Sequence, residues 1–189
     1  MLDKSVEFHR VIMHRKKGTP VPEPSLPEGF KFVRFQEGDE KEWAEIEASV
    51  GEFERAVDAL VYFQENYLPH KGEVERRTIF IESSKEEKVA TLTNWWDYTG
   101  FRRDPWLHWV AVKPEFQNLG LGKAVIFEGM QRMLKIEGDR DVYLPTQTWS
   151  YKAIGIYQKA GFEVTPEKGL GGFDNEYEQA MPILEEVMK

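Results

Sequence analysis

The segment from Pro114 to Ala124, PEFQNLGLGKA, places two glycines and a lysine directly after an apolar run. If Gly120 and Gly122 open a helix, the free backbone N–H groups of its first turn point into the loop, beside the positive end of the helix dipole. A pyrophosphate can bind at such a position, because glycine has no side chain to block its approach. A helix start that simply requires glycine explains the same residues, so the spacing alone leaves both interpretations open.

Two other phosphate-binding motifs do not fit this loop. A P-loop has the pattern GxxxxGK followed by Ser or Thr, whereas Lys123 is followed by Ala124 and no glycine lies five residues before Gly122. A dinucleotide-binding fingerprint needs a third glycine, and Val125 stands at that position. It also needs an acidic residue at a strand end about 20 residues later, and none is suitably placed.

The composition excludes several kinds of site. The 189 residues include no cysteine, which rules out disulfides, zinc–thiolate sites and a cysteine nucleophile and fits a cytoplasmic protein. The net charge of −8 argues against a general nucleic-acid-binding protein. No apolar stretch approaches the roughly 18 residues of a membrane span, and the N-terminus MLDKSVEFHR lacks the apolar segment of a secretory signal. The 4 histidines show no metal-ligand spacing, so we expect no metal site.

The acidic charge is unevenly distributed along the chain. Residues 105–127 contain two lysines and one glutamate, and residues 142–162 contain two lysines and no acidic residue. Locally cationic segments within an acidic protein suit a small polyanion. Buried strands and helices are also poor in acidic residues, so the charge pattern alone does not decide between these interpretations.

Apolar periodicity predicts a mixture of strands and helices. Short alternating or apolar runs indicate strands at Val11–His14, Phe30–Phe35, Thr78–Ile81, Val89–Trp95, Trp106–Val112, Val142–Gln147 and Phe162–Val164. Apolar residues at helical spacing indicate helices after Asp39 as far as Val50, and at Ala56–Tyr67, Leu121–Ile136, Ser150–Ala160 and Pro182–Met188. This order predicts an α/β or α+β fold around one mixed sheet.

Local signals refine the element ends and the domain boundary. Asp39 has the position of an N-cap with Glu42 in capping-box spacing, and Pro182 is predicted in the first turn of the last helix. Residues 1–29 contain four prolines near their end and are predicted as an N-terminal extension or connector. Residues 30–189 are then predicted as a single domain.

The loop and its neighbouring strand resemble the acyl-CoA loop of the GNAT superfamily of N-acetyltransferases. In that family a strand ends in a Val-x-Pro pattern, followed by Gln/Arg-x-x-Gly-x-Gly/Ala and a long helix. The segment VAVKPEFQNLGLGKAV supplies Val112, Pro114, Gln117, Gly120 and Gly122 in that order. The resemblance implies a central mixed, mostly antiparallel twisted sheet flanked by helices.

A second segment, SYKAIGIYQKAGF, resembles the family's other signature, in which an Asn begins a helix that carries Ala and Tyr and ends in Gly-Phe. Ala153, Tyr157, Gly161 and Phe162 match that signature. Ser150 replaces the Asn, so one side-chain contact usual in the family is expected to be weaker here or to move to a neighbouring threonine, Thr148.

The resemblance implies acetyl-CoA as the co-substrate and direct acetyl transfer to an amine in a ternary complex, without a metal. The main chain of Val110, Ala111 and Val112 would pair with the pantetheine arm. The pyrophosphate loop would consist of Gln117, Asn118, Leu119, Gly120, Leu121, Gly122 and Lys123. Ser150, Ala153 and Tyr157 would line the cofactor from the following helix.

The resemblance also suggests which residues move protons. Tyr157 would protonate the departing thiolate, since a phenol with an ordinary pKa of about 10 is neutral at pH 7. His108 shares a face with Val110 and Val112 by the period-two rule and would act as the base, with an ordinary histidine pKa of about 6.5. Each residue could instead be a packed core side chain.

The acceptor is predicted only as a class. Trp95, Trp96 and Tyr98 end one strand, and Trp106 and Trp109 lie on the next. Such aromatic density could form a pocket for an aromatic or cationic amine, with Trp95, Trp96 and Tyr98 as its substrate-binding residues, although tryptophans on adjacent strands are more often core. The acidic helices between Asp39 and Tyr67 also favour a positively charged small-molecule or peptide amine. A homodimer is possible because family members often form one.

Two other functions fit parts of the sequence. A non-catalytic acyl-CoA-binding or regulatory module would keep the loop without the chemistry. An unrelated α/β interaction domain would use the glycines only for structure. Acetyl-CoA binding with acceptor-dependent turnover would distinguish the enzyme from both.

Overall fold

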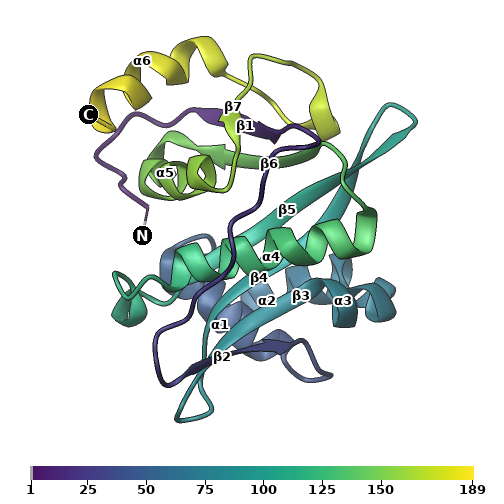
Figure 1. The fold of residues 1–189 in the computed structure, drawn as a ribbon. Coiled ribbons are helices and arrows are strands. Elements are labelled where there is room, and N and C mark those ends of the chain that lie inside the picture. The colour runs from purple at the N-terminus through teal and green to yellow at the C-terminus, as the bar shows by residue number, and fades with distance from the viewer. Residues whose placement is uncertain (1) are drawn as a thin grey trace. The chain divides into compact units, whose positions relative to one another are not determined.

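The computed structural model describes residues 2–189 (Figure 1). The strands are β1 (Arg10–Arg15), β2 (Phe30–Arg34), β3 (Thr78–Ser83), β4 (Lys88–Thr99), β5 (Arg102–Val112), β6 (Val142–Gln147) and β7 (Glu163–Val164). The α-helices are α1 (Glu40–Val50), α2 (Ala56–Asn66), α3 (Lys71–Arg77), α4 (Leu121–Glu137), α5 (Tyr151–Lys159) and α6 (Tyr177–Val187). Among the residues described, no helix is both long and apolar enough to span a bilayer.

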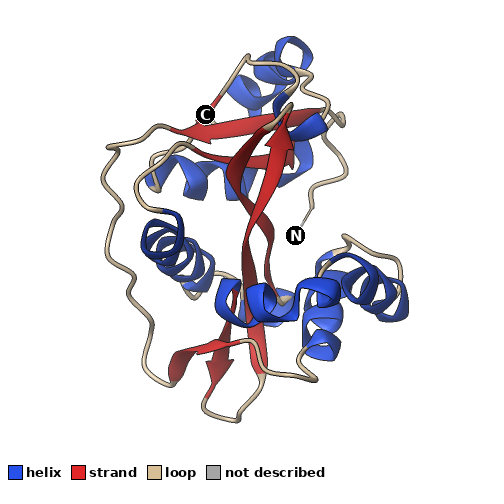
Figure 2. Ribbon diagram, turned by 90° about the vertical axis from the view of Figure 1, so that its right-hand side faces the viewer, coloured by secondary structure: helices blue, strands red, loops and turns tan. Residues whose placement is uncertain are grey.

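The strands of residues 2–189 form one mixed sheet in the order β2-β3-β4-β5-β6-β1-β7. The pairs β2–β3, β3–β4, β1–β6 and β1–β7 are antiparallel. The pair β5–β6 is parallel, with Trp106 opposite Tyr143. Figure 2 shows β4 and β5 as the long strands of the sheet. The predicted mixed, mostly antiparallel sheet is therefore confirmed.

The chain divides into two compact units, and both β4 and β5 run through each of them. The first unit contains Glu23–Thr93 and Trp109–Arg132. The second unit contains Leu2–Pro22, Asn94–His108 and Met133–Lys189. The loop after β5 thus belongs to the first unit, and α5 belongs to the second.

The core of the first unit joins its helices to its strands. Trp43 on α1 and Phe63 on α2 are fully buried, and their ring centroids lie 4.8 Å apart. On α4, a Cβ atom added to Gly129 would lie only 2.6 Å from a methyl carbon of Leu92. The missing side chain therefore allows α4 to pack closely on β4.

The core of the second unit forms around β1. The strand Arg10–Arg15 pairs along its whole length with Val142–Gln147 of β6, and Met13 and His14 also pair with β7. Ile12 is fully buried in a cluster with rings from β5 and β6. The predicted strand at Val11–His14 is confirmed, and it is an interior strand of the sheet.

Most predicted elements are present, but two local predictions are wrong. Asp39 precedes α1, yet its carboxylate accepts from the Gln36 N–H at 2.8 Å and from Lys88 Nζ at 2.7 Å, so the capping box does not form. The last helix begins at Tyr177, which places Pro182 inside it rather than in its first turn.

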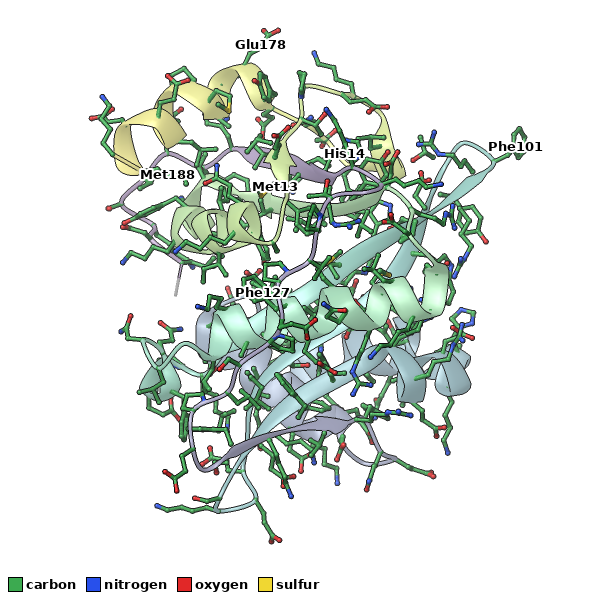
Figure 3. The ribbon with its side chains drawn as sticks, viewed as in Figure 1. Met13, His14, Phe101, Phe127, Glu178 and Met188 are labelled. Atoms are coloured by element: carbon green, nitrogen blue, oxygen red, sulfur yellow. The ribbon has the colours of Figure 1, made fainter. Side chains whose placement is uncertain are left out.

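The strands β4 and β5 are longer than predicted. Strand β4 continues to Thr99, and strand β5 already begins at Arg102. The added residues include charged side chains and a proline, and they do not show the apolar alternation of a strand. Phe101, in the turn between them, is fully exposed and its ring points away from the strands (Figure 3). The sequence pattern also missed α3, which is a short, strongly charged helix.

Candidate functional site

The loop between β5 and α4 contains the predicted phosphate-binding glycines. Gln117 turns its side chain back to the strand, where Nε2 donates to the Val112 carbonyl at 2.9 Å. Asn118 and Gly120 have φ angles of +64° and +84°, in the left-handed region that favours glycine and tolerates asparagine. These two positive angles lead the chain into the first turn of α4.

This loop presents a row of unpaired backbone donors. The N–H groups of residues 118–123 bond to no other group in the part of the chain that the structure describes. The hydrogen bonding of α4 begins with the Ala124 N–H, which donates to the Gly120 carbonyl at 3.1 Å. Residues 118–120 and Lys123 are exposed, and a Cβ at Gly120 would meet no atom within 4 Å. A loop of this kind at a helix N-terminus can bind an anion.

The strand that leads into the loop is irregular at one residue. Trp109 has a φ of +53°, which is an outlier for a bulky side chain within a strand. The left-handed residue interrupts the pleat, so the period-two argument does not carry across it. The prediction that His108 shares a face with Val110 and Val112 therefore loses its basis. Val110–Val112 continue as regular strand to the loop.

His108 lies in a largely apolar environment in the second unit. Its Nε2 is 3.8 Å from a carboxylate oxygen of Asp97, and its ring meets Phe173 edge to face at 6.5 Å between centroids. Burial lowers the pKa of His108 from 6.5 to about 4 and raises the pKa of Asp97. His108 is thus neutral at pH 7 and can accept a proton, but it is a weaker base than a histidine with the ordinary pKa.

The second predicted motif lies on α5. Ser150 is the residue before the helix, and its side chain makes no capping hydrogen bond. Tyr157 is buried, with its ring 6.3 Å from that of Phe162. Ala153 also lies on α5, between Ser150 and Tyr157 in the chain. The hydroxyl of Thr148 bonds to the Glu7 carbonyl, so it already has a partner within the second unit.

The aromatic residues proposed for the acceptor do not form one group. Trp95 and Trp96 stack with centroids 4.2 Å apart, and the guanidinium of Arg103 lies 4.6 Å above the Trp96 ring. Tyr98 is 55% exposed near the turn of the hairpin. The structure therefore brings two of the three residues together and leaves the third at the surface.

Sequence reasoning missed a larger aromatic cluster in the first unit. The ring of Trp109 packs against those of Trp43, Phe53 and Tyr62, and its Nε1 donates to the Tyr67 hydroxyl at 2.8 Å. The predicted helical patterns include Trp43 and Tyr67, which are both buried, but not the half-buried Tyr62. Nothing in the sequence pattern could have shown the backbone of Trp109.

The second unit has a cavity of about 650 Å³ beside β1. Phe8, Arg10, Lys168, Phe173 and Glu176 are among the residues that line it. The Glu176 carboxylate accepts from the Arg10 backbone N–H at 2.8 Å, and the Arg10 guanidinium donates to Asp174 at 3.2 Å. Through the Phe173 ring, this cavity adjoins His108.

The chain was compared with known families and proteins. A model of the acetyltransferase (GNAT) family matches residues 35–162. No curated protein sequence matches the chain. Within residues 2–189, no group of three or more His, Asp or Glu side chains is arranged to hold a metal ion.

Several solved structures share the fold. A GCN5-related N-acetyltransferase from Sphaerobacter thermophilus is 20% identical with a TM-score of 0.68, over 85% of this chain and 49% of that one. Glucosamine-6-phosphate N-acetyltransferase from Arabidopsis thaliana is 19% identical with a TM-score of 0.55, over 79% of this chain and 99% of that one. A tandem GNAT protein from the clavulanic acid biosynthesis pathway is 13% identical with a TM-score of 0.59, over 82% of this chain and 50% of that one.

The match in length differs among these structures. This chain spans about half the length of the Sphaerobacter and tandem proteins, and nearly all of the plant enzyme. The predicted fold class is confirmed by the sheet and by these likenesses. Because the family model covers most of the chain and includes both predicted motifs, the protein belongs to the GNAT acetyltransferase family.

Proposed function

We propose that this protein transfers an acetyl group from acetyl-CoA directly to the nitrogen of an amine. The observation that carries the proposal is the row of free N–H groups at residues 118–123, at the start of α4. Membership of the GNAT family supports acyl transfer as the general kind of reaction. The structurally similar plant enzyme is a glucosamine-6-phosphate N-acetyltransferase, which supports nitrogen as the acceptor atom.

The loop fits the pyrophosphate of coenzyme A in charge and in space. Backbone N–H groups and the positive end of the α4 dipole both favour an anion. Lys123 adds an exposed ammonium in the first turn of the helix. The open space at Gly120 leaves room for a phosphate to approach the main chain. Val110–Val112, which lead directly into this loop, are proposed to bind the pantetheine arm.

Acetyl-CoA supplies an activated acetyl group on a thioester sulfur. In the proposed reaction a neutral amine nitrogen forms a bond to the carbonyl carbon, and the carbon–sulfur bond breaks. The nitrogen loses one proton and the sulfur gains one. We propose Tyr157 as the donor to sulfur and assign neutral His108 only as an acceptor of the amine's proton. Holding the two substrates together can lower the barrier by about 7–11 kcal/mol in well-oriented systems.

Thermal unfolding with acetyl-CoA tests the proposal. A ligand at a hundred times its Kd stabilises the folded state by about 2.7 kcal/mol. For a protein of this size we expect the Tm to rise by about 5–11 °C. ATP and NAD are the control ligands, since both carry phosphates without the pantetheine arm. Equal shifts with all three would contradict a coenzyme A site.

A matched pair of variants locates the site. Lys123→Ala removes an exposed ammonium from the first turn of α4, and Lys135→Ala removes one from its last turn. We expect Lys123→Ala to weaken acetyl-CoA binding about 3-fold to 10-fold, as an exposed charge pair does at low salt, and Lys135→Ala to leave it unchanged. Equal effects of the two would remove the loop from the proposal. Binding without turnover of any amine would instead support a non-catalytic acyl-CoA-binding module.

A further inference from the structure

The loop between β7 and α6 is fixed against β1 at both of its ends (Figure 1). The backbone N–H groups of Thr165 and Glu176 donate to carbonyl oxygens of β1 at 3.0 Å and 2.9 Å. Within the loop, Asn175 Nδ2 donates to the Thr165 carbonyl at 2.8 Å and to the Glu167 carbonyl at 2.7 Å. The cavity of about 650 Å³ that this loop lines therefore has a fixed wall.

The middle of the loop packs closely on the sheet. A Cβ atom added to Gly171 would lie 2.6 Å from a ring carbon of Trp106, and the Phe173 ring lies 5.1 Å from the Trp106 ring between centroids. Gly169 and Gly172 line the cavity, and an added Cβ at either would meet no atom within 4 Å. The loop is therefore packed at Gly171 and open at the two glycines that line the cavity.

The charged side chains of the cavity differ in whether they have partners. The Glu176 carboxylate accepts from the Arg10 backbone N–H at 2.8 Å, and this bond lowers the pKa of Glu176. The Asp174 carboxylate accepts from the Arg10 guanidinium at 3.2 Å. Lys168 is exposed, and its ammonium group has no partner within residues 2–189. Each carboxylate thus has a donor, whereas this ammonium group has no acceptor.

The loop also has unpaired main-chain donors beside Lys168. The N–H groups of Lys168, Gly169, Asp174 and Asn175 bond to no group in the part of the chain that the structure describes. Gly169 has a φ of +74°, and a left-handed residue in a turn directs successive N–H groups to the same side. Unpaired donors next to an ammonium group favour a ligand group that is negatively charged and accepts hydrogen bonds.

Two aromatic rings supply an apolar part of the lining. Phe8 is 40% exposed, and its ring meets that of Trp149 edge to face at 4.8 Å between centroids. Phe173 is half-buried against Trp106. Cavities of this volume with a few polar groups and aromatic walls are typical of small-molecule sites. The rings favour a ligand with a flat apolar group.

We propose that this cavity binds a small carboxylate that carries an aromatic ring or a similar flat apolar group. Lys168 and the free N–H groups beside it hold the carboxylate, and Phe8 and Phe173 pack against the apolar group. The neighbouring carboxylates of Asp174 and Glu176 repel negative charge, so the site favours a singly charged anion over a phosphate dianion. The site lies wholly within the second unit and does not require acetyl-CoA.

Titration calorimetry on the full chain tests the class of ligand. The probes are 3-phenylpropanoate, 3-phenylpropan-1-ol, the ammonium ion of 3-phenylpropylamine and 2-phenylethyl phosphate. We expect the carboxylate to bind at least about tenfold more tightly than the alcohol and the ammonium ion, and more tightly than the phosphate. No measurable binding of the carboxylate, or an equal affinity for the alcohol, would overturn the proposal. Tighter binding of the ammonium ion or the phosphate would exclude a carboxylate site.

Exposed side chains allow matched variants. We expect Lys168→Ala to weaken 3-phenylpropanoate binding about 3-fold to 10-fold and to leave the alcohol unchanged. Lys159→Ala removes an exposed lysine from the last turn of α5, away from the cavity lining, and should change neither Kd. Phe8→Leu should weaken the carboxylate and the alcohol alike. An unchanged Kd of the carboxylate in Lys168→Ala or in Phe8→Leu contradicts the assignment.

NMR of labelled histidine rings locates the bound carboxylate without a substitution. The Phe173 ring lies 6.5 Å from that of His108, and a Glu176 carboxylate oxygen lies 3.4 Å from His9 Nδ1. We expect the resonances of both histidines to shift when 3-phenylpropanoate binds, and those of His70, in the first unit, to stay unchanged. A shift at His70 alone would place the ligand outside this cavity. A normal thermal shift with acetyl-CoA beside any contrary result would leave the proposed function standing.

Discussion

At the scale of single side chains, the environment of His108 differs strongly from that of a free histidine. His108 is 12% exposed, with Phe173 against its ring and Asp97 nearby. The folded protein therefore holds it neutral, with a pKa of about 4. An unfolded histidine takes up a proton below about pH 6.5.

This difference makes stability depend on pH. Between pH 6.5 and pH 4 the unfolded chain binds a proton at His108 that the folded chain does not, so stability falls as the pH falls through this range. The loss from this group is about 3 kcal/mol. Asp97, whose pKa is raised, contributes with the opposite sign. We expect His108→Gln to lose less stability than the unmodified protein between pH 7 and pH 4.

Urea unfolding at pH 7, 5.5 and 4 measures this difference, and Asp97→Asn reports the opposing contribution. Parallel pH dependences of the unmodified protein and His108→Gln would show that His108 is protonated as readily in the folded state as in the unfolded chain. In that case His108 would keep the ordinary histidine pKa of about 6.5 and would be a stronger base than its burial implies.

At the scale of single residues, the sequence could predict candidate residues but not the environment of each side chain. A glycine at the start of α4 was predictable because the chain turns into the helix there, and Gly120 has a φ of +84°, which favours glycine. The low pKa of His108 depends on Phe173 and on burial, which come from distant parts of the chain. Pattern and spacing cannot show such contacts.

Among the elements, helix α4 depends on one missing side chain. Gly129→Ala would place its Cβ within 2.6 Å of one Leu92 methyl carbon and 2.7 Å of the other, so Leu92 or the helix must move. We expect a net loss of about 1–2 kcal/mol, because overpacking outweighs the gain in helix propensity. This corresponds to a Tm lower by roughly 2–8 °C.

Gly72→Ala is the control for this prediction. Gly72 lies in α3 with nothing within 4 Å of the added Cβ, so the alanine should raise stability by up to about 1 kcal/mol. Differential scanning calorimetry of both variants compares the two effects. A Gly129→Ala protein as stable as the unmodified one would mean that α4 does not pack tightly on β4.

Periodicity found the elements that bury an apolar face and missed those that do not. Helix α4 was predicted almost to the residue because its apolar residues repeat with the helical period, and β6 was predicted from its short apolar run. Helix α3 is short and charged, and the strand ends next to the hairpin turn, Asp97–Thr99 and Arg102–Asp104, are mostly polar. Helix α6 keeps Pro182 within it, against the usual preference for the first turn.

At the scale of the whole molecule, strand β1 joins β7 to the rest of the sheet. It lies between β6 and β7 and is paired on both edges. We expect a variant that lacks residues 2–16 to lose cooperative unfolding, since its removal leaves β6 and β7 without a common partner. Residues 1–29 were predicted as an extension, because a single apolar run followed by a proline-rich stretch does not reveal which distant strand it pairs with.

Circular dichroism during thermal unfolding checks this expectation. A variant lacking only residues 2–5, which precede β1, is the control and should unfold as sharply as the full chain. A cooperative transition within a few degrees of the full-length value in the longer deletion would show that β1 is dispensable. Solubility at equal concentration provides a second readout, because unpaired strand edges associate.

The position of β1 also has a consequence during synthesis on the ribosome. Its residues leave the exit tunnel before those of every other strand described, whereas its partners, β6 and β7, are made only after more than two thirds of the described chain. The two edges of this apolar strand therefore stay unpaired until β6 and β7 have been made. Contacts between residues so distant in sequence also form slowly. Until β7 emerges, the nascent chain carries a strand that a chaperone, or another nascent copy, can capture.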